Sequence, residues 1–222
     1  MDLKEIWSRL KGIIIFGIAY MAAFFFMEAR NVPIHIIHTK FDDMIPFCEY
    51  FIIPYVLWYL YVCGTVLYLG LTDKDLKEYS KFIFNMELGM IIFVIVSFVY
   101  PNGQDLRPSI TVDSFCTWLI HTLYTVDTST NILPSLHVYA SAACCIALCR
   151  NYRFRKHPLR QLAVCTLTIL ICLSTMFIKQ HSIIDVVSAL FFIGLFYPLI
   201  YQQESIAARA ALRKKPVRRR VF

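Results

Sequence analysis

Residues 182–201 read SIIDVVSALFFIGLFYPLIY, and these twenty residues contain one charged side chain, Asp185. An α-helix rises about 1.5 Å per residue, so a run of this length crosses the roughly 30 Å hydrocarbon core of a bilayer. The run is continuously apolar rather than alternating, which favours a helix over a strand of a β-barrel. The stretch therefore predicts a transmembrane helix that carries a single acid.

Five further apolar runs precede this one along the chain. They cover residues 12–27, 47–71, 83–100, 132–149 and 163–178. Hydrophobic residues make up 58% of the chain and charged residues 17%, which excludes a soluble domain and a disordered chain. No internal repeat or low-complexity linker divides the sequence. We expect an all-α bundle of six transmembrane helices that forms one integral membrane domain over residues 1–222.

The basic residues predict how the bundle is oriented, because cytoplasmic segments of membrane proteins retain Lys and Arg. The N-terminus, residues 72–82, residues 150–160 and the tail 202–222 hold 18 of the 22 Lys and Arg residues. We expect both termini in the cytoplasm and the loops after the first, third and fifth helices outside. The excess of positive charge, +7 in total, lies on these membrane-flanking segments. We expect the basic tail to be attracted to anionic lipid headgroups, so membrane lipids rather than nucleic acid are the expected partners.

The chain contains eight cysteines, and most of them fall inside the predicted helices. Those six are Cys63, Cys144, Cys145, Cys149, Cys165 and Cys172. Cysteines inside apolar helices usually behave as small apolar residues, and no C-x-x-C spacing of a metal site occurs. With only Cys48 and Cys116 near the outer face, the sequence predicts neither a disulfide framework nor a metal site.

Polar residues are concentrated at the predicted outward ends of the helices. They lie in three segments, namely Arg107-Pro108, Pro134-Ser135-Leu136-His137 and residues 179–185, which include Lys179, His181 and Asp185. Ionisable groups at the edge of a membrane are costly to bury and are candidates for a functional site. We therefore expect these segments to converge.

His181 and Asp185 are four residues apart, so on a helix they share a face. The carboxylate can then accept the proton of one ring nitrogen and leave the other nitrogen more nucleophilic. This spacing predicts an activated histidine nucleophile. The alternative is a hydrogen bond that serves only the structure.

Pro134 suits the first turn of a helix, which would leave the amides of Ser135, Leu136 and His137 pointing outward. Together with the positive end of the helix dipole, these amides favour an anion. The Ser135 hydroxyl adds another hydrogen-bonding group, and the His137 imidazole adds a proton donor. A plain helix cap, with the histidine at the level of the lipid headgroups, is the alternative.

Arg107 and Lys179 are the two outward cations nearest these motifs. A guanidinium can hold two phosphate oxygens, and an ammonium adds a point charge. If the fifth helix stays regular to its outer end, Thr175 and Lys179 share a face and the ammonium reaches the same oxygens. Two cations, two histidines and an aspartate around an anion favour phosphoryl transfer over acyl transfer.

In their order, Arg107-Pro108, Pro134-Ser135-Leu136-His137 and His181-x-x-x-Asp185 resemble the three motifs of the type 2 phosphatidic acid phosphatase superfamily. This family has a six-helix membrane fold, and its motifs read K-x6-R-P, P-S-G-H and S-R-x5-H-x3-D. The resemblance implies that His181 forms a phosphohistidine, Asp185 orients it and His137 protonates the leaving alcohol. It also implies that Arg107 and Ser135 hold the phosphate, without a metal or other cofactor.

The sequence departs from the family motifs at three positions. Tyr100 stands where the family has the first lysine, and Thr175 stands where it has the third-motif arginine, so we expect Lys179 to supply a replacement charge. Leu136 replaces the glycine of P-S-G-H. This variant is similar to the lipid phosphotransferase branch, which includes inositol phosphorylceramide synthases.

Three classes of function follow from these observations. The first is a lipid-phosphate phosphatase whose active site faces the extracytoplasmic side of the cell membrane. The second is a lipid phosphotransferase that passes the phospho-headgroup to an alcohol through the same intermediate, and the third is a non-catalytic membrane protein with this fold. Two histidines and an aspartate can also bind zinc, so a metal-dependent phosphatase stays open at this point.

Overall fold

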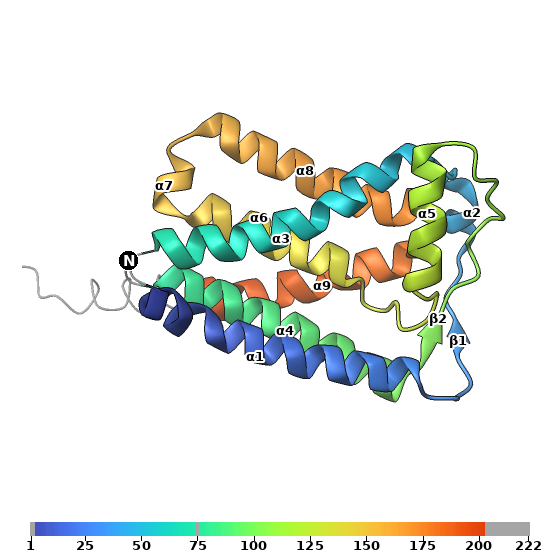
Figure 1. Cartoon of the computed structure of the whole chain (residues 1–222), viewed down its shortest axis with the longest axis horizontal. Coiled ribbons are helices and arrows are strands. Elements are labelled where there is room, and N and C mark those ends of the chain that lie inside the picture. The colour runs from blue at the N-terminus through green and yellow to red at the C-terminus, as the bar shows by residue number, and fades with distance from the viewer. Residues whose placement is uncertain (1–2, 74–75, 203–222) are drawn as a thin grey trace, which may run out of the picture.

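The computed structural model describes residues 3–73 and 76–202, so the basic tail beyond Gln202 lies outside the described residues. Within the described ranges, six helices run along the long axis of the molecule (Figure 1). They are α1 (Leu3–Glu28), α3 (Ile52–Thr72), α4 (Lys77–Val99), α6 (Leu136–Arg150), α8 (Pro158–Phe177) and α9 (Ile183–Tyr197). The prediction of an all-α fold is confirmed.

Five of these helices are long and apolar enough to cross a membrane, which supports a multi-pass membrane protein. The 3-10 turn η1 (Glu49–Phe51) extends α3, and the π-helical turn η2 (Pro198–Gln202) extends α9. Helix α6 has only 15 residues, which corresponds to about 22 Å. The sixth crossing and the side of the membrane on which the termini lie therefore stay predictions.

The short elements collect at one end of the bundle, which we call the loop end (Figure 1). They are β1 (His35–Ile36), α2 (Lys40–Met44), β2 (Asn102–Gly103) and α5 (Phe115–Val126). β1 and β2 pair in parallel. The beginning of α1 and α7 (Tyr152–Arg155) lie at the opposite end, together with the end of α3 and the beginning of α4. The segments predicted to be cytoplasmic, as far as they are described, thus share one end of the molecule.

Helix α6 packs against α3, α4, α8 and α9 and forms the centre of the bundle. Its buried face consists mainly of alanine, serine and cysteine, and small residues of this kind let helix backbones approach closely. Gly89 of α4 faces this helix, and a Cβ atom at Gly89 would lie 2.2 Å from Tyr139 Cε1. The Tyr139 hydroxyl donates to Asn85 Oδ1 at 2.8 Å, so the ring is held in place.

We expect Gly89→Ala to destabilise the bundle, because the added methyl group collides with the Tyr139 ring. Overpacking of this kind costs about 1–3 kcal/mol. The matched control is Gly64→Ala on α3, where a Cβ atom meets nothing within 4 Å. The apparent Tm in detergent should fall for Gly89→Ala and stay unchanged or rise for Gly64→Ala. Equal melting temperatures for Gly89→Ala and the parent would contradict the close approach of α4 and α6.

Candidate functional site

The second predicted motif lies at the beginning of α6. Ser135 is the N-cap residue, and its Oγ accepts from the Val138 amide at 3.4 Å. The Ser135 amide donates to the backbone carbonyl of Asp185 at 3.2 Å, which joins the first turns of α6 and α9. Pro134 therefore precedes the cap, and the predictions that it occupies the first turn and that the Ser135 amide is free are wrong. A serine suits this position because its hydroxyl can accept a hydrogen bond from an amide of the first turn, which has no acceptor within the helix.

His181 and Asp185 lie together where α9 begins. The His181 Nδ1 atom is 3.3 Å from Asp185 Oδ2, and the Ser182 amide donates to the same oxygen at 2.8 Å. Asp185 is fully buried. These contacts fix the carboxylate against one ring nitrogen, while His181 Nε2 makes no hydrogen bond to any described residue. The predicted pairing of a histidine with an aspartate is therefore present.

His137 lies beside His181, with their ring centroids 5.9 Å apart. Two aromatic residues of α3 contact the His137 ring, Tyr55 at 4.4 Å and Trp58 at 4.3 Å between centroids. The Nε2 atom of His137 and the Nε1 atom of Trp58 are buried and have no hydrogen-bond partner. The sequence did not indicate these α3 contacts, because aromatic residues are ordinary in an apolar helix.

Arg107 reaches the same end of the bundle from the loop before α5. One terminal nitrogen donates to the carbonyls of Asp127 at 2.8 Å and Thr128 at 2.7 Å, and also to the Gln180 side chain. The guanidinium lies 4.4 Å above the Tyr124 ring. Its Nε atom is buried without a partner. The loop carbonyls and Gln180 therefore hold Arg107 next to the turn that carries His181, and Nε–H has no hydrogen-bond partner.

Asp127 is a site residue that sequence reasoning missed. Its Oδ2 atom accepts from the Tyr55 hydroxyl at 3.2 Å and lies 3.5 Å from Gln180 Nε2. Burial raises the pKa of the Asp127 carboxyl, while the charges of His181 and Arg107 act in the opposite direction. Asp127 thus adds a carboxyl group to the surroundings of both His181 and Arg107. In the sequence it was one of several acids in a long loop, with no spacing that tied it to a motif.

The structure does not bring Lys179 to the other predicted site residues in the way that the sequence suggested. Helix α8 ends at Phe177, and Lys179 adopts a left-handed conformation with φ 53°. The amides of Gln180 and His181 both donate to the Thr175 carbonyl, which closes the end of the helix. The prediction of a regular helix through Lys179 is therefore wrong.

The Lys179 ammonium instead donates to the segment around α2, residues 39–48, which we call the α2 segment. Its Nζ atom donates to the carbonyls of Asp42, at 2.7 Å, and Ile45. Lys179 is buried in this position. We therefore leave Lys179 out of the candidate phosphate-binding residues and assign it the docking of the α2 segment.

Asp42 makes the reciprocal contact from the α2 segment to the start of α9. Its carboxylate accepts from the Ile183 amide at 2.8 Å and from the Ser182 hydroxyl at 2.7 Å, and further from Thr39. Burial on its own raises the pKa of Asp42, but these hydrogen bonds outweigh it and lower the pKa below the ordinary value. Asp42 and Lys179 together fix the turn that carries His181.

An exposed histidine joins the α2 segment to the loop after β2. His38 Nδ1 lies 2.9 Å from Asp105 Oδ1, and His38 Nε2 lies 2.7 Å from Asp43 Oδ1. The hydrogen bonds to Asp43 and Asp105 raise the pKa of His38 above its ordinary value of 6.5. The protonated ring therefore bridges two carboxylates on the surface of the loop end.

The two histidines and the aspartate of the site do not form a compact metal-ligand cluster. Among the described residues, Cys145, Cys149 and Cys165 are the one group of three with ligand atoms all within 4.8 Å of one another. No protein-family model, curated protein or solved structure matches the chain. The functional argument therefore rests on the motifs and on the geometry described above.

We expect Lys179→Met to destabilise the protein, because it removes the donor to the buried carbonyls of Asp42 and Ile45. The loss of a charged donor of this kind costs about 1–3 kcal/mol. The control is Lys40→Met, since Lys40 is exposed in the same segment. The apparent Tm should fall only for Lys179→Met, and proteolysis between residues 39 and 48 should become faster. If both variants melt like the parent, the lysine does not anchor this segment.

We expect the contribution of His38 to stability to depend on pH. The raised pKa means that the folded protein binds the proton more tightly than the unfolded chain does, so the stabilisation is complete below pH 6.5. It is lost as the pH rises through the raised pKa. The Tm difference between the parent and His38→Ala should therefore be largest at pH 5.5 and shrink toward pH 9. A difference for His38→Ala that is constant with pH would contradict the bridge.

Proposed function

We propose that the chain is a membrane lipid-phosphate phosphatase that works through a phosphohistidine at His181. The observation that carries this proposal is the arrangement of two histidines 5.9 Å apart, one of them paired with a fully buried aspartate. At this separation a single phosphoryl group can contact both rings. The resemblance of the three motifs to the type 2 phosphatidic acid phosphatase superfamily supports the same chemistry.

In the first step His181 Nε2 attacks phosphorus, and the bond from phosphorus to the lipid oxygen breaks. Asp185 accepts the Nδ1–H of His181 and stabilises the positive charge that develops on the ring. His137 gives its proton to the leaving oxygen, so the lipid departs as an alcohol. Contacts with the rings of Tyr55 and Trp58 hold its ring for this role.

In the second step water attacks the phosphohistidine. His137, now neutral, takes a proton from the water while the bond between His181 and phosphorus breaks. Inorganic phosphate leaves, and both histidines return to their starting protonation states. The same two rings thus act in both steps with the roles of acid and base exchanged at His137.

The surroundings of the two rings favour an anion. Leu136 and His137 occupy the first two positions of α6, and a helix has no internal acceptors for these amides. The positive end of the helix dipole acts in the same direction. Because Lys179 is engaged elsewhere, Arg107 is the cation that we assign to the phosphate, through its unpartnered Nε–H. Ser135 contributes by fixing the start of α6 rather than through a free amide.

We further propose that α6 is the sixth crossing, that both termini are cytoplasmic and that the loop end faces the extracytoplasmic side. The distribution of Lys and Arg supports this orientation, since the beginning of α1, α7 and the ends of α3 and α4 that face each other along the chain lie at the end opposite the site. A lipid phosphate can then approach with its headgroup toward the two histidines and its chains in the bilayer. Leu136, half-buried beside His137, adds apolar surface there.

Leu136 also favours a second candidate function, lipid phosphotransfer. It occupies the glycine position of the second motif, as in the phosphotransferase branch that the sequence resembles. In that reaction the first step is unchanged, and an alcohol replaces water in the second. The two functions therefore differ in the acceptor alone.

The experiment that tests the proposal uses the purified protein with a panel of phospholipid and polyprenyl phosphates. The parent should release phosphate, and His181→Ala should abolish both turnover and any trapped phosphoenzyme. His137→Ala should slow turnover by about 10² to 10⁴, the usual contribution of a proton-transfer group. The control His121→Ala should retain the parent rate, and EDTA should have little effect.

Each other outcome has a definite meaning. Full activity of His181→Ala contradicts the phosphohistidine, as does a loss in EDTA that zinc restores. A phosphorylated alcohol in place of free phosphate identifies the phosphotransferase. If the folded parent turns over no member of the panel, with or without added alcohols, the chain is a non-catalytic protein with this fold.

A further inference from the structure

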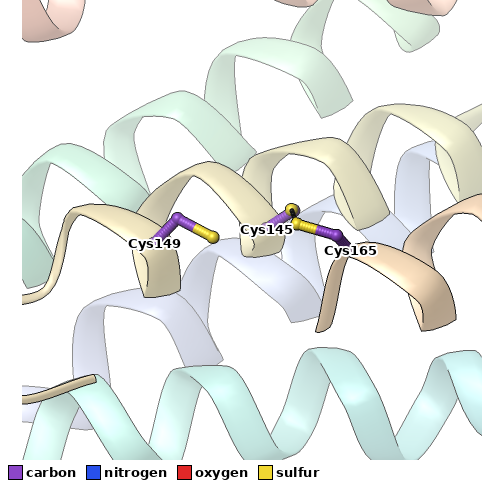
Figure 2. A group of neighbouring side chains, drawn as sticks. All are labelled: Cys145, Cys149 and Cys165. Carbon is purple, nitrogen blue, oxygen red and sulfur yellow. Dashed lines mark hydrogen bonds between the residues drawn. The ribbon is translucent and has the colours of Figure 1, made fainter. Parts of the chain in front are cut away.

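A second cluster of reactive side chains lies away from the histidine site, between α6 and α8. It consists of Cys145 and Cys149 on α6 and Cys165 on α8 (Figure 2). The three sulfur atoms all lie within 4.8 Å of one another, and the Sγ atoms of Cys145 and Cys165 are 3.7 Å apart. We infer that these three thiols form a binding site for one soft metal ion of the Cu(I) type.

The sequence spacing explains why the α6 thiols point to the same place. Cys145 and Cys149 are four residues apart, so they share one face of α6. Cys165 lies opposite this face in the first half of α8, and Figure 2 shows its sulfur next to that of Cys145, with the sulfur of Cys149 turned toward both. All three cysteines are half-buried, whereas Cys144, the immediate neighbour of Cys145, is buried in the core.

The distances match a three-coordinate sulfur site. With metal–sulfur bonds of about 2.3 Å, three sulfurs around a metal in one plane lie about 4 Å apart. The separation of 3.7 Å and the limit of 4.8 Å bracket that value. Small side-chain rotations therefore suffice for binding, and the helices need not move apart.

The set of donors selects the kind of metal. Thiolates are soft ligands that favour Cu(I), zinc and iron–sulfur clusters. Zinc in proteins is almost always four-coordinate, but no His, Asp or Glu joins these cysteines in the compact group among the described residues. A Cu(I) ion needs only two or three sulfur ligands. On binding, the metal ion displaces thiol protons, and these protons pass to the solvent. No oxidation or reduction is required.

A hydroxyl contact joins a third helix to the helix that carries Cys165. The Thr168 Oγ1 atom of α8 lies 3.1 Å from the Tyr61 hydroxyl of α3. Thr168 is three residues after Cys165 and so lies on the same side of α8. Helix α3 therefore helps to hold α8 close to the cluster.

The test uses the full-length protein in detergent under anaerobic, reducing conditions, with Cu(I) delivered from a competing chelator. The parent should bind one equivalent more tightly than the variant that combines Cys145→Ser, Cys149→Ser and Cys165→Ser. The matched control combines Cys63→Ser and Cys172→Ser, two helix cysteines outside the cluster. The control should bind Cu(I) like the parent. Cu(I) should raise the apparent Tm of both the parent and the control, and this rise should be absent from the triple variant.

X-ray absorption on the parent provides a second measurement that does not depend on the folding of any variant. The Cu(I) form should show a first shell of sulfur alone, with no nitrogen or oxygen ligand. Equal Cu(I) binding by the parent and a folded triple variant would overturn the inference, as would a first shell of nitrogen or oxygen. A Cys145–Cys165 disulfide in protein alkylated directly on cell lysis would also overturn it. None of these readouts depends on phosphatase activity.

Discussion

The hydrogen bond from the Ser135 amide to the Asp185 carbonyl is the contact on which the arrangement of the site depends. It joins the first turn of α6, which holds His137, to the first turn of α9, which holds Asp185 and follows directly after His181. Helix α6 can make this contact because it is short and begins only after the Ser135 cap, so its positive end lies within the bundle. A longer α6 that started at Ile132, as the apolar run suggested, would carry His137 on a different turn relative to α9.

Buried polar side chains at the loop end make this junction rigid. Asp42 accepts from the Ile183 amide and the Ser182 hydroxyl at the start of α9, and Lys179 donates back to the α2 segment, so the turn with His181 is held from both sides. Glu28 does the same for the loop before α6, where it accepts from the Thr130 hydroxyl at 2.9 Å and also from Thr128 and Asn131. Charged groups near an apolar core require partners, and here those partners are the loops that position the site.

The sequence predicted the helices well, because long apolar runs allow few other structures in a membrane. It also predicted the pairing of His181 with Asp185, although His181 lies just before the Ser182 cap, so the contact reaches across the cap and does not run along a helix face. It failed at Lys179, because a left-handed residue ended α8 and no glycine marked that position. Asp127, Tyr55 and the contact between Cys145 and Cys165 depend on how separate helices pack, and no spacing within one segment contains that information.

The same two helix segments carry both clusters of reactive side chains. Helix α6 holds His137 in its first turn and Cys149 near its last residue, and α8 carries Cys165 before its end leads into the turn with His181. A metal ion bound at the proposed thiol site would restrain the relative motion of α6 and α8 without touching the histidines. The Ser135–Asp185 contact joins the other end of α6 to α9. The proposed metal site and the proposed catalytic site would therefore act at opposite ends of one short helix.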